Sequence, residues 1–248
     1  MATSKVKHTR RIKRTVPLNQ AEAVGEGKLR IVKALLLSNL VSVVLFGLRV
    51  IVTQSDRYWF LFWNLMLAWL PALFAFLLLR QLKNGSWKQP IPILLTVLWL
   101  GFLPNSFYLM SDLIHLQSTG DIGVLFDAVL FLSCIWNGAV AGMLSIVWVH
   151  TATYKKIGPN IAAVAVAAAL GLASFAIYLG RILRWNTWDV LFNPAGILFD
   201  VSDRVINPLT HPQFILTTLT FFVLLGSMYM VIWQFVRYFN PLTTSKSK

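Results

Sequence analysis

Asp112 and His115 are the first side chains in this apolar chain that could do chemistry together. They follow Ser111, a residue type that caps helices. If a short helix begins there, the carboxylate and the imidazole share one face, a spacing that suits a general base with its orienting partner, or two metal ligands. A surface histidine paired with a carboxylate has the same spacing. A metal would need a third ligand, and the candidates are Asp127, Asp189 and His211. We expect no bound metal and no other cofactor.

A second polar run, Tyr178–Asp189, is rich in cationic and aromatic side chains. We predict an ion pair between Arg181 and Asp127. The alternative is a guanidinium that binds a phosphate or carboxylate through two hydrogen bonds. The tryptophans could anchor the chain at an interface or stack on a ligand. The ligand-binding candidates of this run are Tyr178, Arg181, Arg184, Trp185, Asn186, Trp188 and Asp189.

Asn105 is a further candidate because it lies beside a proline inside an apolar run. Pro104 has no N–H, so the carbonyl of Leu100 loses its helical donor, and the Asn105 amide could supply one. Whether the helix breaks at this point stays open. A broken helix at membrane depth often marks a binding site, whereas many proline kinks are only structural.

Asp127 and Asn137 are the two polar candidates of the next apolar segment. Asp127 shares a helical face with small residues, among them Gly138, and a carboxylate inside a membrane is costly and commonly functional. The pattern Gly138-x-x-x-Gly142 predicts close packing against another helix. Asn137 is expected to hydrogen-bond a neighbouring helix.

These side chains must be positioned by long apolar helices. Hydrophobic residues make up 57% of the 248 residues and charged residues 12%, about half the share that soluble domains carry. A span needs about 20 apolar residues. Six segments qualify: Ile31–Val52, Tyr58–Leu79, Ile91–Met110, Gly123–Val149, Asn160–Leu183 and Gln213–Tyr238.

A short amphipathic helix is predicted between the last two segments. Asn193 and Pro194 form a cap and a first turn, after which Ile197, Leu198, Val201 and Val205 share one face. The expected fold is therefore an all-α membrane protein, a bundle of six transmembrane helices plus a short outer interfacial helix that roofs the bundle.

The basic residues predict the orientation of the bundle. Most of the 22 Lys and Arg residues precede Ile31, follow the second and fourth segments, or follow the sixth, and such residues stay in the cytoplasm. Residues 1–30 and 240–248 are then cytoplasmic tails, 31–239 is a six-span membrane domain, and the protein is a multi-pass protein of the cell membrane. The polar segments described above fall on the outer side.

The net charge of +13 is mostly explained by these basic segments. The cluster Lys5–Arg14 is expected to lie on anionic lipid head groups, at about 1 kcal/mol per residue. The expected partner is therefore the lipid bilayer, with no nucleic acid, and the sequence leaves protein partners undefined.

The polar runs together resemble an uncharacterised bacterial membrane family, domain of unknown function 1361. The residues that carry the resemblance are Leu103-Pro104-Asn105, Ser111 to His115, Trp136-Asn137 and Tyr178 to Asp189. Leu103 departs from the pattern, which has an aromatic residue there. The resemblance covers about Leu35 to Tyr238, implies a six-span protein of the bacterial cytoplasmic membrane, and implies no activity.

Four functions stay open at this level. The polar cluster on the outer side could bind an anionic lipid or a polar solute. It could serve a metal-assisted hydrolase or transferase of the outer leaflet, although the usual hydrolase, zinc-protease and phosphate-loop motifs are absent. The chain could also be a transporter or a structural accessory subunit.

Overall fold

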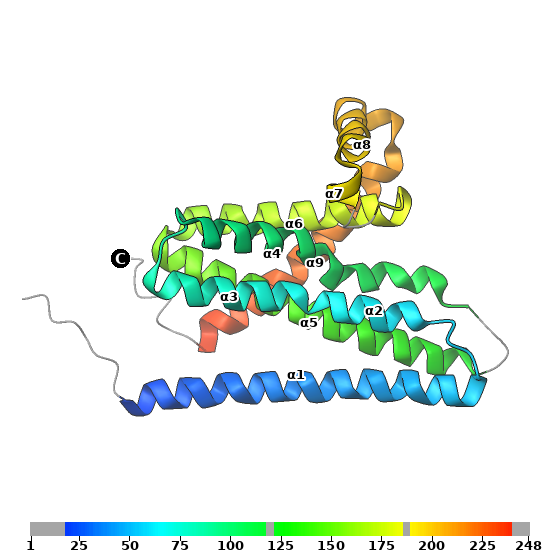
Figure 1. Cartoon of the computed structure of the whole chain (residues 1–248), viewed down its shortest axis with the longest axis horizontal. Helices are drawn as coiled ribbons and strands as arrows, with labels where there is room; N and C mark the ends of the chain where they lie inside the picture. Colours follow the sequence, from blue (N-terminus) through cyan, green and yellow to red (C-terminus); the bar gives the residue numbers. More distant parts are fainter. Residues whose placement is uncertain (1–17, 118–121, 186–188, 240–248) are drawn as a thin grey trace, which may run out of the picture.

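The protein is a bundle of long helices that run alongside one another (Figure 1). The computed structural model describes the backbone of residues 18–117, 122–185 and 189–239, and side chains from Arg30 onward except 190 and 191. The elements are α1 (Leu18–Thr53), α2 (Trp59–Ala68), α3 (Leu70–Asn84), α4 (Pro90–Ser111), η1 (Asp112–His115), α5 (Val124–Lys156), α6 (Pro159–Ile182), α7 (Asp189–Phe192), α8 (Pro194–Ile206), η2 (Pro208–Thr210) and α9 (Pro212–Phe239).

The predicted six-span architecture is confirmed among the described residues. The spans are α1 from Arg30, α2 with α3, α4 with η1, α5, α6 and α9, and each is long and apolar enough to cross a membrane. Helix α1 begins at Leu18, well before the predicted Ile31, so part of the basic tail is helical. We call the end of the bundle that holds η1 and the first turn of α5 the Asp112 end. It lies on the right in Figure 1.

The second span is interrupted, which the sequence prediction of one continuous helix missed. Helix α2 ends at Ala68 and α3 begins at Leu70, around Trp69. Pro71 follows directly and has no N–H, so the helical ladder loses a bond here. The hydroxyl of Ser106 on α4 donates to the carbonyl of Ala68 at 2.7 Å and supplies a donor at the interruption.

Helix α4, in contrast, runs without a break through Pro104. The prediction that Asn105 would satisfy the carbonyl of Leu100 is not confirmed, because Asn105 makes no side-chain hydrogen bond with any described residue. Its side chain lines a cavity instead.

Helix α4 is the centre of the bundle and packs against α2, α3, α5 and α6. The predicted glycine pattern on α5 allows a close contact between α4 and α5. A Cβ added to Gly138 would lie 2.8 Å from the carbonyl oxygen of Ser106, and one added to Gly142 would lie 2.6 Å from the Ser106 Cβ. The two helices can therefore approach only because these positions have no side chain.

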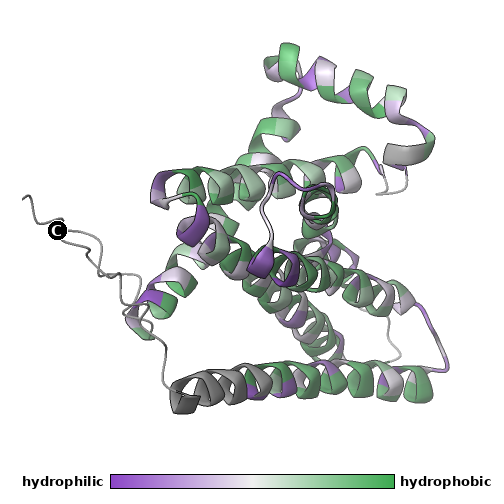
Figure 2. Ribbon diagram, turned by 60° about the vertical axis from the view of Figure 1, so that its left-hand side comes forward, coloured by the Kyte–Doolittle hydropathy of each residue, from purple (hydrophilic) through white to green (hydrophobic). Residues whose placement is uncertain are grey.

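Helices α1 and α9 lie at the edges of the bundle and expose apolar side chains (Figure 2). Leu37 on α1 is 64% exposed and Leu216 on α9 is 69% exposed. Helix α1 contacts α5 towards the Asp112 end and separates from the bundle at its other end (Figures 1 and 2). Such continuous apolar surfaces fit a lipid bilayer and would aggregate in water.

Candidate functional site

Arg181 is the centre of a polar cluster at the Asp112 end. It comes from the last turn of α6 and reaches the junction of α4 and η1. Its Nη2 pairs with Asp112 Oδ1, its Nε and Nη2 donate to Ser111 Oγ at 3.0 and 2.8 Å, and its Nη1 lies 3.0 Å from His115 Nε2. All three guanidinium nitrogens are therefore occupied by protein groups.

Two more residues complete the cluster, and neither was a sequence candidate. Asn64 on α2 donates to Asp112 Oδ2 at 2.9 Å, so both oxygens of this buried carboxylate are hydrogen-bonded. Tyr108 on α4 places its ring under the Arg181 guanidinium, 4.4 Å from Cζ to the ring centroid, and donates to the Gly180 carbonyl at 3.1 Å. A polar Asn inside an apolar span was the signal that could have singled out Asn64.

The predicted pair between Arg181 and Asp127 is wrong. Asp127 pairs with Arg49 of α1, with Nε 2.8 Å from Oδ1, and the two side chains are 0% and 1% exposed. The guanidinium of Arg49 also lies over the Tyr58 ring at 4.2 Å. Both acids lie at the same end of the bundle, and the rotation of each helix about its axis decides which arginine faces which acid. Hydropathy does not determine that rotation precisely.

No hydrogen bond joins Asp112 to His115 in the described structure. They lie in a 3-10 turn, Ser111 makes no side-chain cap bond, and both side chains contact Arg181. His211 is not brought to them, because its Nε2 lies 2.7 Å from Asp203 Oδ2 beside α8. No three His, Cys, Asp or Glu side chains gather within the part of the chain that the structure describes. A guanidinium against both potential ligands also opposes a cation.

Asn137 has the predicted structural role near the middle of α5. It donates to Ser42 Oγ at 2.9 Å and to the Ser38 carbonyl at 3.1 Å, both on α1. Its Oδ1 accepts from Asn39, whose own Oδ1 accepts from the Trp69 indole. This network joins α1, α5 and the interruption between α2 and α3, so the amide of Asn137 is used between helices.

The segment after α6 is fixed by a second set of hydrogen bonds. Trp185 donates from Nε1 to Asp200 Oδ2 at 2.7 Å, and Arg204 donates from Nε to the hydroxyl of buried Tyr178 at 3.2 Å and from Nη1 to Asp200 Oδ1 at 3.1 Å. These bonds attach the polar face of α8 to the end of α6. Arg184 has a left-handed backbone (φ 61°) that turns the chain towards Trp185, and its side chain is exposed.

The predicted amphipathic helix exists as α8 and is capped by Asn193, whose Oδ1 accepts from the Gly196 N–H at 3.1 Å. It does not roof the bundle. It projects from the side of α6, and Leu198, Phe199, Val205 and Ile206 are exposed on its outer face (Figure 1). Of the remaining candidates, Asp189 begins α7, and Asn186 and Trp188 lie outside the described residues.

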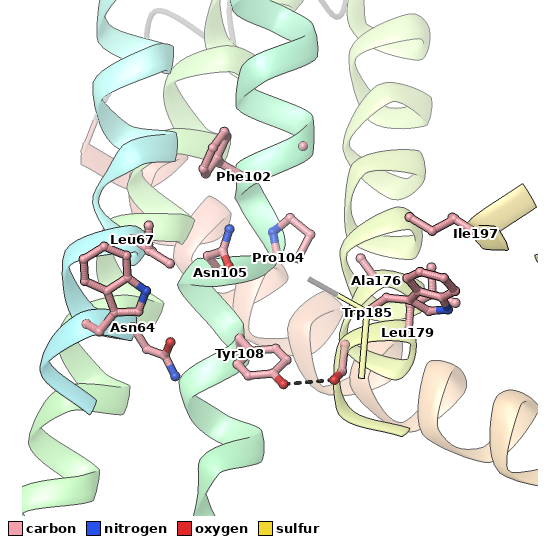
Figure 3. Close-up of a pocket in the computed structure, with 13 residues that line it drawn as sticks. Asn64, Leu67, Phe102, Pro104, Asn105, Tyr108, Ala176, Leu179, Trp185 and Ile197 are labelled. Carbon is pink, nitrogen blue, oxygen red and sulfur yellow. Dashed lines mark hydrogen bonds between the residues drawn. The ribbon is translucent and has the colours of Figure 1, made fainter. Parts of the chain in front are cut away.

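A cavity of about 300 Å³ opens between α2, α4 and α6 beside the Arg181 cluster. Figure 3 shows Asn64 from α2, Asn105 and Tyr108 from α4, and Trp185 after α6 around this space. The wall is completed by Trp63, Leu67, Gly101, Phe102, Pro104, Ala176, Leu179, Gly180 and Ile197. Asn105 and Trp185 were sequence candidates, whereas Asn64, Gly101 and Tyr108 were not.

The fold and the polar centre define a multi-pass helical membrane protein with a cavity near one end. The chain belongs to the protein family of unknown function DUF1361, whose model matches residues 63–228. The match confirms the resemblance seen in the sequence. It includes Asn64, Asp112 and Arg181 but not Arg49. No curated protein and no solved structure matches the chain.

Proposed function

We propose that this protein binds the polar headgroup of a membrane lipid, or a small polar solute, in the cavity between α2, α4 and α6. The observation that carries the proposal is the cavity itself. Its wall combines side-chain amides with aromatic rings, and the Asn105 amide makes no hydrogen bond with a described residue. The cavity lies beside Pro104 of α4. Small-molecule sites are typically concave, mostly apolar and furnished with a few placed polar groups.

The Arg181 cluster has a structural role beside this cavity. Its guanidinium nitrogens already contact Ser111, Asp112 and His115, so little capacity is left to bind a phosphate or carboxylate. Both oxygens of Asp112 are also hydrogen-bonded to protein groups, so neither is placed to take a proton from a ligand. The cluster thus favours a binding protein over the hydrolase or transferase alternative.

We further propose that the Asp112 end faces outward and that both termini are cytoplasmic. The basic side chains of α3, α5 and α9, including Lys83, Lys156 and Arg237, lie towards the opposite end. The tail Lys5–Arg14, outside the described residues, would then contact anionic lipids of the inner leaflet. A reporter fused after Lys248 should be active in the cytoplasm, and activity on the outer side would contradict this orientation.

Filling the cavity tests the binding proposal. A Cβ on Gly101 meets no other atom within 4 Å, and Gly101 lies in the cavity wall, so Gly101→Phe should place a ring in the cavity without a clash at its base. Gly226→Phe on α9 is the matched control, because Gly226 is equally unobstructed and does not line the cavity.

The measurement is native mass spectrometry of each variant released from its own membrane in mild detergent. We expect a discrete bound molecule on the wild type and on Gly226→Phe that is lost from Gly101→Phe. Equal retention of the bound molecule by the wild type and both variants would overturn the proposed function.

A further inference from the structure

The cavity wall, as far as the structure describes it, holds no charged side chain. Every described lining residue is neutral, from Asn64 and Asn105 to the aromatic rings. Arg181 is the neighbouring cation, and the Tyr108 ring stacks against it while forming part of the wall. The Arg181 charge is also paired with Asp112. A charged ligand would therefore lose its hydration without gaining a counter-charge in the cavity.

The wall offers both hydrogen-bond acceptors and donors. One of the two N–H groups of the Asn64 amide donates to Asp112, which leaves its second N–H and its carbonyl oxygen free. Tyr108 donates its proton to the Gly180 carbonyl, so its hydroxyl oxygen can only accept.

The donors that remain in the wall are few. Among the described residues they are the second Asn64 N–H, the Asn105 amide and the Trp63 indole, because the Trp185 indole is used on Asp200. An ionised phosphate or carboxylate only accepts hydrogen bonds and would leave the acceptor oxygens of Asn64, Asn105 and Tyr108 without a donor. A hydroxyl group both donates and accepts, so a group with several hydroxyls fits this inventory.

The shape of the cavity points to a single ring. Its volume of about 300 Å³ is at the small end of ligand pockets. The indole of Trp185 and the rings of Phe102 and Tyr108 offer flat apolar surfaces, against which the C–H faces of a sugar ring can pack while its hydroxyls reach the amides (Figure 3).

We propose that the ligand is an uncharged, hydroxyl-rich headgroup, such as the glycosyl group of a membrane glycolipid, with its acyl chains left in the bilayer. This inference rests on the proposed function and names its ligand class. The outer surface of α2 is apolar, and Trp63 on it is 50% exposed, so in a bilayer this surface would face lipid, which favours a lipid-linked source over a free sugar.

The test uses the full-length protein in phosphatidylcholine nanodiscs that contain equal fractions of monoglucosyl diacylglycerol and phosphatidylglycerol. Native mass spectrometry after release measures which lipid is retained. We expect glucosyl lipid to be retained about tenfold over phosphatidylglycerol, which corresponds to about 1.4 kcal/mol. Asn105→Leu should lower this retention about tenfold, because it removes the free amide. Gly101→Phe should abolish it, and Gly226→Phe should leave it unchanged.

The outcomes separate this inference from the proposed function. Retention of phosphatidylglycerol or phosphatidylcholine that Gly101→Phe removes would overturn the neutral class and leave the binding function in place. Binding of free methyl glucoside without retention of glycolipid would overturn the lipid source. Retention that Gly101→Phe does not change would overturn both the inference and the function.

Discussion

The two ion pairs at the Asp112 end are alike in composition and differ in their surroundings. Arg49 and Asp127 are sealed, with 0% and 1% of their side chains exposed, and Arg49 Nη2 and Asp127 Oδ2 have no hydrogen-bond partner in the described structure. The Arg181 side chain is 14% exposed. Arg181 and Asp112 bind each other, and further hydrogen bonds join them to Ser111, His115 and Asn64.

This difference indicates two roles. The sealed pair joins the peripheral α1 to α5 across 78 residues of sequence. The second pair lies behind the cavity wall, and its guanidinium holds the Tyr108 ring in place. A sealed pair can be replaced by apolar residues, whereas a pair that orients a wall cannot, and this contrast can be tested.

The largest effect is expected from breaking the sealed pair. Asp127→Leu should lower the free energy of unfolding by about 3–5 kcal/mol, because it leaves the Arg49 charge buried without its partner. The double variant Arg49→Leu/Asp127→Leu should recover most of that loss. Denaturant unfolding in mixed micelles measures both, and a double variant no more stable than the single one would contradict the sealed-pair role.

A smaller effect is expected at the second pair. Arg181→Lys should lower the free energy of unfolding by about 1–2 kcal/mol, because one ammonium cannot reach Ser111, Asp112 and His115 together. It should also weaken lipid retention several-fold, because Tyr108 loses the planar group above its ring. Arg184→Lys, at an exposed position, is the control and should change neither quantity. Unchanged lipid retention in Arg181→Lys would separate the pair from the cavity.

The attachment of α8 should depend on a hydrogen bond to a carboxylate, worth about 1.5 kcal/mol. Trp185→Phe removes the 2.7 Å bond to Asp200 and should speed amide hydrogen exchange in α8 without affecting α5. Trp136→Phe on the exposed face of α5 serves as the control. Unchanged exchange in α8 would show that Arg204 alone holds this helix.

The smallest effect extends the comparison to an exposed pair, Asp203 with His211. Hydrogen bonds from Asn207 and then His211 lower the pKa of the Asp203 carboxyl. A lowered carboxyl pKa stabilises the fold above the ordinary value of about 3.9, and this contribution is lost as the pH falls through the lowered pKa. Hydrogen exchange across residues 203–211 should therefore accelerate only below that range, and Asp203→Asn should remove the pH step.

The six spans could be predicted from sequence because hydropathy and length alone define them. The interruption at Trp69 was not predicted, because Pro71 alone indicates a lost hydrogen bond and does not show whether the helix breaks. Helix α4 passes through Pro104 intact, whereas α2 and α3 separate before Pro71. A proline thus predicts a lost hydrogen bond, and the neighbouring helices decide whether the backbone breaks there.

The candidate site was only partly predictable for a similar reason. Asp112, His115 and Arg181 were candidates in the sequence and do lie together. The predicted pair of Arg181 with Asp127 was wrong, because Arg181 pairs with Asp112 and Asp127 pairs with Arg49. The cavity could not be predicted because it depends on three helices and on glycines such as Gly101, whose lack of a side chain carries no chemical signal.

The position of Arg49 has a consequence for biosynthesis. The ribosome makes α1 before α5, so Arg49 is synthesised 78 residues before its partner Asp127 exists. The first helix must therefore wait near the interface with a solvated guanidinium. Arrival of the fourth span at the translocon is then the event that draws Arg49 inward and fixes the first helix, so a chain truncated before Asp127 should leave α1 unanchored.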